Sequence, residues 1–215
     1  MGHEIVERRP LPRPRASGQG SADPDQELVL LWRAGDVDAF GALVRRHERR
    51  VYRLLLRMLG SREEAEDAAQ ETFLNLHRHG HYFRGDALFS TFVYRVAANA
   101  ALNRRRTLGR SHAREQGLAR LQQTGAELPA APLDPERAAV AAEERATVQA
   151  ALLELSPRLR LPLVLYDLEG LPYPEIARML DLPEGTVKSR IHRARERLRE
   201  ILVGAGARGA REPLR

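Results

Sequence analysis

The sequence predicts an all-α protein in which two small helical domains are joined by a flexible linker. Apolar residues recur at helical spacing over residues 25–106 and again over 136–202, as they do along the buried face of an amphipathic helix. Between these regions, residues 107–135 lose that period and become rich in Gly, Ala, Pro and Gln, which indicates a linker. Residues 1–24, rich in Pro and Arg, and residues 203–215 are predicted to be disordered tails.

The composition limits the class of protein and its partners. The chain has 215 residues, of which 43% are hydrophobic and 30% are charged, and its formal net charge is +6. Such a balance favours a polyanionic partner, either nucleic acid or an anionic membrane surface. The chain contains no cysteine, which excludes disulfides and thiolate zinc sites. No run approaches the roughly 18 apolar residues of a membrane span and no apolar secretion signal is present, so we expect a cytoplasmic protein without membrane insertion.

Capping residues and turn residues divide the first domain into four helices. A short helix ends at Gly35, and a longer one follows up to Leu59. Gly60 fits the C′ position after a helix, where a left-handed conformation is common. The third helix is expected over residues 62–79 and the fourth over 90–106. Two side chains are predicted to cap helix N-termini, namely Asp36 and, as the start of a capping box, Ser61.

The fourth helix and the loop before it carry groups suited to nucleic acid. Five of the chain's eleven aromatic residues fall between residues 82 and 94. Aromatic rings can stack on unpaired bases, at about 1–3 kcal/mol per base. Phe89 and Phe92 suit the protein core, whereas both roles stay open for the loop residues Tyr82 and Phe83. The helix also presents a polar stripe that can donate to phosphates and base edges, formed by Arg95, Asn99, Asn103 and Arg106.

The second domain is predicted to begin with two helices, and a capping residue and a proline separate them. The first of them stops at Ser156, and Pro157 suits the first turn of the second. That second helix contains Pro162, which should remove a hydrogen bond and bend it, and Gly170 ends it. A short amphipathic helix follows over residues 173–180.

This short helix, a turn at residues 181–185 and a basic helix up to residue 199 together predict a helix-turn-helix. From residue 186 to 199 there are six Lys or Arg and one acid. We expect the second helix to enter a DNA major groove; the alternative is a basic amphipathic helix on a solvated face. Its candidate DNA contacts are Thr186, Lys188, Ser189, Arg190, Arg193 and Arg197.

These motifs resemble those of bacterial RNA polymerase sigma factors of the extracytoplasmic-function (ECF) group of the sigma-70 family. The resemblance covers residues 27–106 and 140–201. In the first domain it rests on AEDAAQETFLNLHR and FRGDALFSTFVYRVAANAALNRRR. In the second domain GTVKSRIHRAR is the most specific piece. The resemblance implies that residues 25–106 form sigma region 2 and residues 136–202 form sigma region 4.

The resemblance also implies a division of labour on core RNA polymerase and promoter DNA. The fourth helix and its loop are expected to recognise and melt the minus-ten element. The helix-turn-helix is expected to read the duplex minus-thirty-five element, while its domain contacts the flap of the second-largest polymerase subunit. An anti-sigma partner is implied, and no catalytic residue, metal site or cofactor is expected. Docking on the clamp helices of the largest subunit is expected to use Asp67, Gln70, Glu71, Phe73 and Leu74.

Two other functions fit part of the sequence. A dimeric helix-turn-helix transcriptional regulator acting on duplex DNA would use the same C-terminal motif, but it has little use for an aromatic loop. An enzyme is the second alternative, yet the sequence contains no Gly-rich phosphate loop, no HExxH and no nucleophile elbow. His77, His79 and His81 form an HxHxH run. Alternate positions of a helix diverge by about 200°, so we expect at most an adventitious metal site there.

Overall fold

Every regular element of the structure is a helix within the residues that it describes. The computed structural model describes residues 23–80, 83, 85, 87–115 and 135–209. Its α-helices are α1 Gln26–Arg33, α2 Val37–Leu59, α3 Arg62–His79, α4 Phe89–Glu115, α5 Pro135–Glu154, α6 Pro157–Leu163, α7 Tyr173–Leu180 and α8 Glu184–Gly209, and the π-helix η2 Val164–Leu168 follows α6. Most of the predicted tails and linker lies outside the described residues, namely 1–22, 116–134 and 210–215. Among the described helices, none combines the length and the apolar character needed to cross a bilayer.

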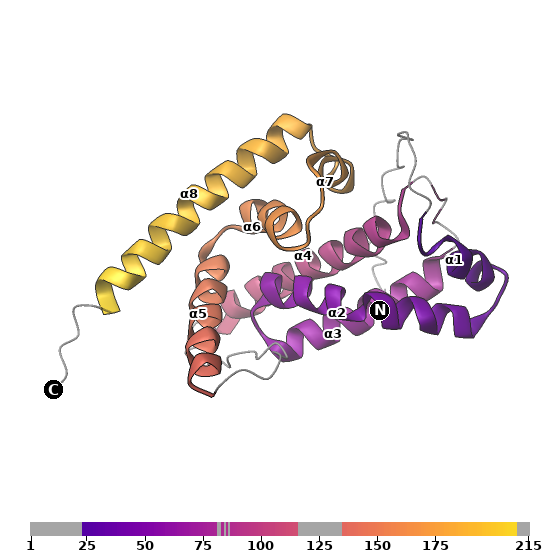
Figure 1. Ribbon diagram of the computed structural model, residues 1–215, viewed down its shortest axis with the longest axis horizontal. Coiled ribbons are helices and arrows are strands. Elements are labelled where there is room, and N and C mark those ends of the chain that lie inside the picture. Colours follow the sequence, from indigo (N-terminus) through magenta and orange to yellow (C-terminus); the bar gives the residue numbers. More distant parts are fainter. Residues whose placement is uncertain (1–22, 81–82, 84, 86, 116–134, 210–215) are drawn as a thin grey trace.

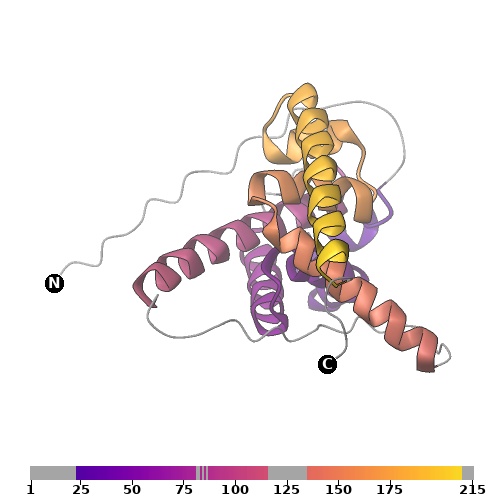
Figure 2. The ribbon, with the colours of Figure 1, turned by 90° about the vertical axis from the view of Figure 1, so that its left-hand side faces the viewer.

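The helices form two groups that lie against each other (Figure 1). In the first group α2, α3 and α4 pack side by side and α1 packs on α2. In the second group α6, η2 and α7 pack together, and α8 packs on α6 and α7. α5 contacts both groups, because it packs on α2 and on α8. In the view of Figure 2, α8 lies in front of the second group, so its outer side faces away from α2, α3 and α4.

The helix ends of the first group confirm the capping predictions. The carboxylate of Asp36 accepts a hydrogen bond from the Ala39 N–H at 3.0 Å, and Ser61 Oγ accepts one from the Glu64 N–H at 3.4 Å. Gly60 has a φ of 83°, the left-handed conformation expected at C′. A side chain at this position would also collide with Leu153 of α5. Local sequence sets these ends, and the contact with α5 adds a second reason for glycine.

Two helices are longer than the apolar pattern predicts. α4 continues to Glu115 instead of ending near Arg106, and α8 continues to Gly209, beyond the expected end at residue 202. Neither extension contains proline, and adding residues to an existing helix costs little compared with starting one. Apolar periodicity marks only the part of a helix that packs on a core, so it ends before the helix does.

The N-terminus of α4 is capped by a residue from the predicted tail. Asp23 Oδ2 accepts a hydrogen bond from the Phe89 N–H at 2.6 Å. The neighbouring Asp25 is buried, and its carboxylate lies 2.7 Å from His47 Nε2 and 2.5 Å from Arg46 Nη1. The prediction of a tail up to residue 24 is therefore too long, because Asp23 holds the start of a helix far along the chain.

Pro162 changes the type of helix that follows it. α6 ends one residue after this proline, and in η2 the Glu169 N–H donates to the Val164 carbonyl, five residues earlier, at 3.1 Å. Proline has no N–H to donate, so the α-helical hydrogen-bond pattern is already interrupted at this point. The sequence predicts a bend here, and the structure contains a π-helix, which carries Tyr166 and Asp167 to the side of α8.

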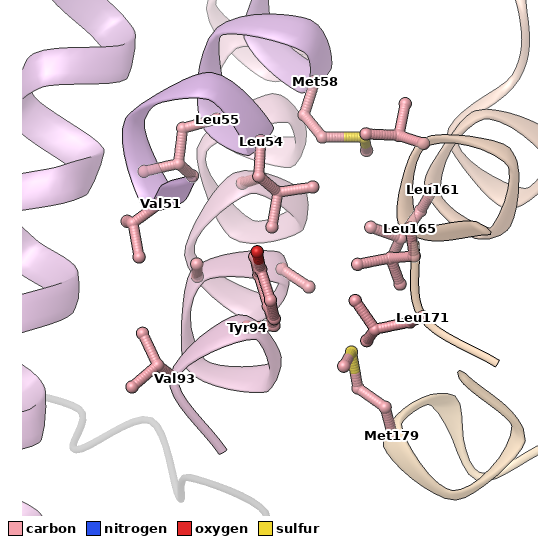
Figure 3. Packing of buried hydrophobic residues seen from close by; sticks show 14 of the residues in the cluster. Val51, Leu54, Leu55, Met58, Val93, Tyr94, Leu161, Leu165, Leu171 and Met179 are labelled. Atoms are coloured by element: carbon pink, nitrogen blue, oxygen red, sulfur yellow. The ribbon is translucent and has the colours of Figure 1, made fainter. Parts of the chain in front are cut away.

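The two groups share one apolar cluster (Figure 3). Buried side chains of the first group face buried side chains of the second across this cluster. Leu54, Met58 and Tyr94 lie on one side, and Leu161, Leu165, Leu171 and Met179 lie on the other. The predicted domains are therefore in direct contact in this structure.

Arg160 joins the two groups at the edge of the apolar cluster. Its side chain is 0% exposed, and burial lowers its pKa to about 9, which leaves it charged at neutral pH. Carbonyls at a helix C-terminus lack helical partners and carry the negative end of the helix dipole. Arg160 supplies hydrogen-bond donors to the C-terminal ends of both α2 and α5. Its guanidinium donates to the carbonyls of Met58, Leu152, Leu153 and Leu155.

A second set of polar contacts surrounds Glu169, whose side chain is buried at the same interface. Its carboxylate accepts a hydrogen bond from Tyr94 Oη at 2.8 Å and lies 3.8 Å from Arg53 Nη2. Burial, and then the charge of Glu169, raises the pKa of the Tyr94 hydroxyl. Nearby, Thr91 Oγ1 donates to Glu175 Oε2 at 2.9 Å. An interface that mixes apolar packing with polar pairs resembles those between domains that move relative to each other.

Candidate nucleic-acid interface

α8 presents an apolar face to the protein and a basic face to solvent. Val187, Ile191 and Ala194 are buried, which confirms the predicted apolar stripe. The six candidate DNA contacts lie around the rest of the helix. Lys188, Ser189, Arg193 and Arg197 are exposed, and Thr186 and Arg190 are half-buried. The geometry therefore leaves a basic helix surface open from Lys188 to Arg197.

A tight turn sets the angle at which α8 leaves α7. Asp181 follows α7 with a φ of 53°, a left-handed conformation that aspartate adopts more readily than most residues. The Leu182 N–H donates to the Ala177 carbonyl at 3.0 Å. α8 then starts at Glu184, within the stretch that the sequence assigns to the turn. Two helices joined in this way form the predicted helix-turn-helix.

Acidic side chains of α8 pair with some of its cations. Lys188 Nζ lies 3.2 Å from Glu184 Oε1, and Arg197 Nη1 lies 2.8 Å from Glu200 Oε2. All four side chains are about half exposed or more, and an exposed ion pair contributes only about 0–1 kcal/mol. A phosphate can therefore replace either carboxylate with little loss.

The structure adds two tyrosines and one arginine that the sequence analysis left out. Tyr166 and Tyr173 stack on each other beside α8, and Arg195 lies over the Tyr166 ring while pairing with Asp167. Arg195 belongs to the basic stretch of α8, so its charge was visible in the sequence. The two tyrosines flank Gly170 in the sequence, but nothing in their spacing indicates that the chain folds back to stack them.

The polar stripe of α4 lies mostly on the surface. Asn99, Asn103 and Arg106 are exposed. Arg95 is half-buried, with its guanidinium carbon 5.5 Å from the centre of the Phe92 ring, and burial lowers its pKa. The stripe therefore offers two amides and one guanidinium to a partner, with Arg95 held at its inner end.

The aromatic residues before α4 divide between core and undescribed chain. Phe89 and Phe92 are buried, as expected. Phe83 is only 6% exposed, and its ring centre lies 5.4 Å from that of Phe89 and 5.3 Å from that of Phe92. Of the two roles left open for Phe83, this structure favours the core, because stacking on a base would require the ring to leave this cluster. Tyr82 lies outside the described residues.

One face of α3 carries most of the candidate polymerase contacts. Asp67, Gln70, Glu71 and Leu74 are exposed and line a shallow hollow between α3 and α4. Leu74 is 47% exposed, although its surroundings are polar. Arg104 Nη2 donates to Asp67 Oδ2 at 2.7 Å across the hollow. Phe73 is half-buried against the core, so it supports this surface from below.

The two described histidines of the HxHxH run contact other residues of the protein. The His77 ring packs on Phe40 with the ring centres 4.9 Å apart, and His79 Nδ1 lies 3.0 Å from the Asn75 carbonyl. His81 lies outside the described residues. Within the part of the chain that the structure describes, no three His, Asp or Glu side chains gather as a metal site would require.

Both helical groups match known protein families. Residues 43–111 match the family described as Sigma-70 region 2, and residues 145–198 match the family described as Sigma-70, region 4. The chain is 37% identical over 182 residues to the RNA polymerase sigma-H factor of Pseudomonas aeruginosa, a match that covers 84% of this chain and 94% of the relative. It is 38% identical over 174 residues to the ECF RNA polymerase sigma factor SigW of Bacillus subtilis, covering 78% of this chain and 91% of the relative.

Two solved structures share the fold. One is the sigma factor RpoE of Bartonella quintana in complex with the anti-sigma factor NepR, with a TM-score of 0.62 and 23% identity over 77% of this chain and 98% of that one. The other is CnrH in complex with the cytosolic domain of CnrY, also with a TM-score of 0.62 and 23% identity, covering 85% of this chain and 99% of that one. At this level of identity the likeness concerns the fold.

Proposed function

The chain belongs to the extracytoplasmic-function group of the sigma-70 family, and on that premise we propose that it directs promoter-specific transcription initiation by core RNA polymerase. It recognises the promoter through two separate contacts. Residues 25–106 recognise and open the minus-ten element, and residues 136–202 read the minus-thirty-five element. The alternative of a dimeric helix-turn-helix regulator is not favoured, because both sigma regions match along one chain and the relatives are sigma factors.

The observation that carries this proposal is the pair of accessible polar surfaces, one on α4 and one on α8, in a single chain. One recognition helix reads only a few base pairs, and each mismatch costs about 1–3 kcal/mol, so competing genomic sites would outnumber its target. A second contact on the same promoter removes this difficulty. Core polymerase supplies the frame on which both contacts form at once.

The residues of the proposed DNA contacts follow from these surfaces. On α8, Arg193 and Lys188 contact phosphates or base edges in the major groove, with Ser189, Thr186, Arg190 and Arg197 around them. On α4, Asn99, Asn103 and Arg106 contact the minus-ten element, together with Arg95 and the loop residue Tyr82. Phe83 packs in the core and would contact a base only if its ring left that cluster. The free energy of binding unpaired bases offsets the cost of opening them.

The proposed polymerase contact is the exposed face of α3. Asp67, Gln70, Glu71 and Leu74 meet the clamp helices of the largest subunit, with Phe73 beneath them, and the second domain meets the flap of the second-largest subunit. We also propose an anti-sigma partner, supported by the two solved complexes of similar fold. Such a partner should compete with core polymerase for this chain in a binding assay.

Both promoter contacts require the two helical groups to separate. The elements lie roughly 25 base pairs apart by their names, which is roughly 85 Å at 3.4 Å per base pair. In the structure the groups touch through Arg160, Glu169 and the apolar cluster. The chain between Glu115 and Pro135 can span at most roughly 70 Å when fully extended. The widths of the two helical groups cover the remainder of the distance between the two promoter elements.

Reconstituted transcription tests the proposed function. Purified core polymerase and this chain are mixed with fragmented genomic DNA of the source organism, and transcript start sites are mapped. Starts that share two upstream sequence elements and disappear when the chain is omitted support the proposal. Binding to core polymerase without any such transcript would overturn it, as would a symmetric footprint on duplex DNA in the absence of polymerase.

Replacing Arg193 by alanine is expected to weaken binding to the upstream element about tenfold, because a lost phosphate or base contact costs about 1–3 kcal/mol. Fluorescence anisotropy of the holoenzyme on a labelled upstream duplex measures the change. The matched control is Arg145→Ala, which removes an exposed arginine of α5 that is not among the DNA contacts. Equal losses for the two variants would contradict a specific role for Arg193.

Replacing Asn99 by alanine is expected to slow promoter opening about fivefold, since one hydrogen bond contributes about 1 kcal/mol, while duplex binding stays the same. Asn99 is exposed, so the fold should tolerate the change. Permanganate reactivity of unpaired thymines measures opening over time. A template with a pre-opened minus-ten region should reduce the deficit; an equal deficit on both templates would argue against a role in opening.

A further inference from the structure

Two tyrosines stack beside α8, and each outer face of the stack meets a cation of that helix. Tyr166 comes from η2 and Tyr173 is the first residue of α7; their ring centres lie 4.3 Å apart and their planes differ by 1°. Lys188 Nζ lies 5.4 Å from the centre of the Tyr173 ring, and the guanidinium carbon of Arg195 lies 5.4 Å from that of Tyr166. The order is cation, ring, ring, cation.

The two cations lie on the same side of α8. Lys188 and Arg195 are seven residues apart, nearly two full turns, which corresponds to a rise of about 10 Å along the helix. Both side chains are about half exposed. They can therefore contact phosphates of one strand at the edge of a groove that holds α8.

Each cation is restrained by a ring and by a carboxylate. Arg195 Nε donates to Asp167 Oδ2 at 3.0 Å, and this hydrogen bonding raises the pKa of Arg195. Lys188 pairs with Glu184 at 3.2 Å. A guanidinium has five N–H donors, so Arg195 keeps donors for a phosphate while it is held in this way.

We propose that the Tyr166–Tyr173 stack is a positioning element for minus-thirty-five recognition, which holds Lys188 and Arg195 in the orientation in which both contact DNA phosphates. This inference rests on the proposed function of α8. Long cationic side chains lose much rotamer freedom on binding, and restraint before binding reduces that loss. The negative face of an aromatic ring attracts a cation without neutralising it. The tyrosines thus act through the cations and do not themselves read bases.

A purely structural role for the stack makes a different prediction. If the rings only hold η2 against α7, removing one should weaken DNA binding to the same degree whether or not Lys188 is present. If Tyr173 acts through Lys188, the loss of DNA binding in the double variant should be smaller than the sum of the losses in the two single variants. A double-mutant cycle separates these cases, because it measures how far two substitutions depend on each other.

The experiment uses the full chain bound to core polymerase and a duplex selected from a random upstream library by the parent holoenzyme. The variants are Tyr173→Leu, Tyr166→Leu, the ring-preserving Tyr173→Phe and Tyr166→Phe, Lys188→Met, and the double variant with Tyr173→Leu and Lys188→Met. Affinity is measured between 50 and 200 mM salt, the range in which phosphate contacts dominate the salt dependence. Binding of each variant to core polymerase and its thermal melting are measured separately.

The leucine variants are expected to bind the duplex about five- to tenfold more weakly, with a salt slope smaller in magnitude by about 1, while the phenylalanine variants stay within about twofold of the parent. In the Lys188→Met background, Tyr173→Leu should add less than about twofold. Core polymerase binding should not change.

Four outcomes would overturn the inference. Leucine variants that bind the duplex with the parent's affinity and salt slope would show that the rings do not position the cations. Additive losses in the double-mutant cycle, or losses explained by lowered melting temperatures, would assign the stack to folding alone. In each of these first three cases the proposed function would stand if the parent holoenzyme selects a duplex. A parent holoenzyme that selects no upstream sequence would overturn the function and this inference together.

Discussion

Linking α4 to α7 is expected to reduce promoter-dependent transcription at least tenfold, and cleaving the link should restore it. Thr91 and Glu175 are in direct contact across the interface of the two helical groups, with 2.9 Å between Thr91 Oγ1 and Glu175 Oε2. A chain with both replaced by cysteine can be joined by a short thiol-reactive linker that contains a cleavable disulfide. The linked chain cannot place its two proposed DNA-binding surfaces on elements roughly 85 Å apart.

The chain suits this experiment because it contains no cysteine of its own. Run-off transcription by the reconstituted holoenzyme, before and after reduction, gives the readout. The matched control is a link within α5 between cysteines at Glu143 and Thr147, two exposed positions one turn apart. Full transcription from the Thr91–Glu175 linked chain would contradict the proposed separation of the groups. Transcription that stays low after the link is cleaved would point to damage from the substitutions themselves.

Replacing Arg160 by methionine is expected to lower the free energy of unfolding by about 2–4 kcal/mol. The substitution removes a donor from four backbone carbonyls at the ends of α2 and α5, although the Leu152 carbonyl still accepts from the Leu155 N–H and the Met58 carbonyl from Arg105. Each buried acceptor left without a partner costs about 1–3 kcal/mol, and relief from burying the guanidinium offsets part of the total. Urea denaturation followed by circular dichroism measures the change.

Arg158→Met is the control for Arg160, because it makes the same chemical change at an exposed position of α6. It should change the free energy of unfolding by less than about 0.5 kcal/mol. Arg160→Lys should recover only part of the loss, since one ammonium lacks the forked donors that reach several carbonyls. An Arg160→Met chain as stable as the parent would show that water or neighbouring donors satisfy these carbonyls.

Some features of the fold were predictable because they depend on nearby residues. Asp36 and Ser61 cap helices through N–H groups three residues ahead, and Gly60 takes its left-handed conformation within a single turn. The apolar stripe of α8 follows from the helical period alone. The helix ends were less predictable, as at Glu115, since apolar spacing records packing and not helix formation.

The candidate sites were predictable to the extent that exposure follows from position on a helix. Asn99, Asn103 and Arg193 are exposed as their spacing predicts. Phe83 could not be assigned, because an aromatic residue in a loop can turn toward the core or toward a partner. The tyrosine stack was missed for a related reason. Its two rings meet only because a π-helix after Pro162 carries Tyr166 to the side of α8.

The sequence by itself determined that the chain is helical, the caps at Asp36 and Ser61, the helix-turn-helix and the exposed basic face of α8, because these depend on residues within a few turns of one another. Only the tertiary structure decided what the buried faces pack against. In the sequence nothing distinguishes Arg160 from a surface arginine, yet its guanidinium donates to the Met58 carbonyl, 102 residues away. Glu169 likewise finds Tyr94 from the other helical group. Helical period specifies which side of a helix is buried, and it carries no information about which distant partner covers that side.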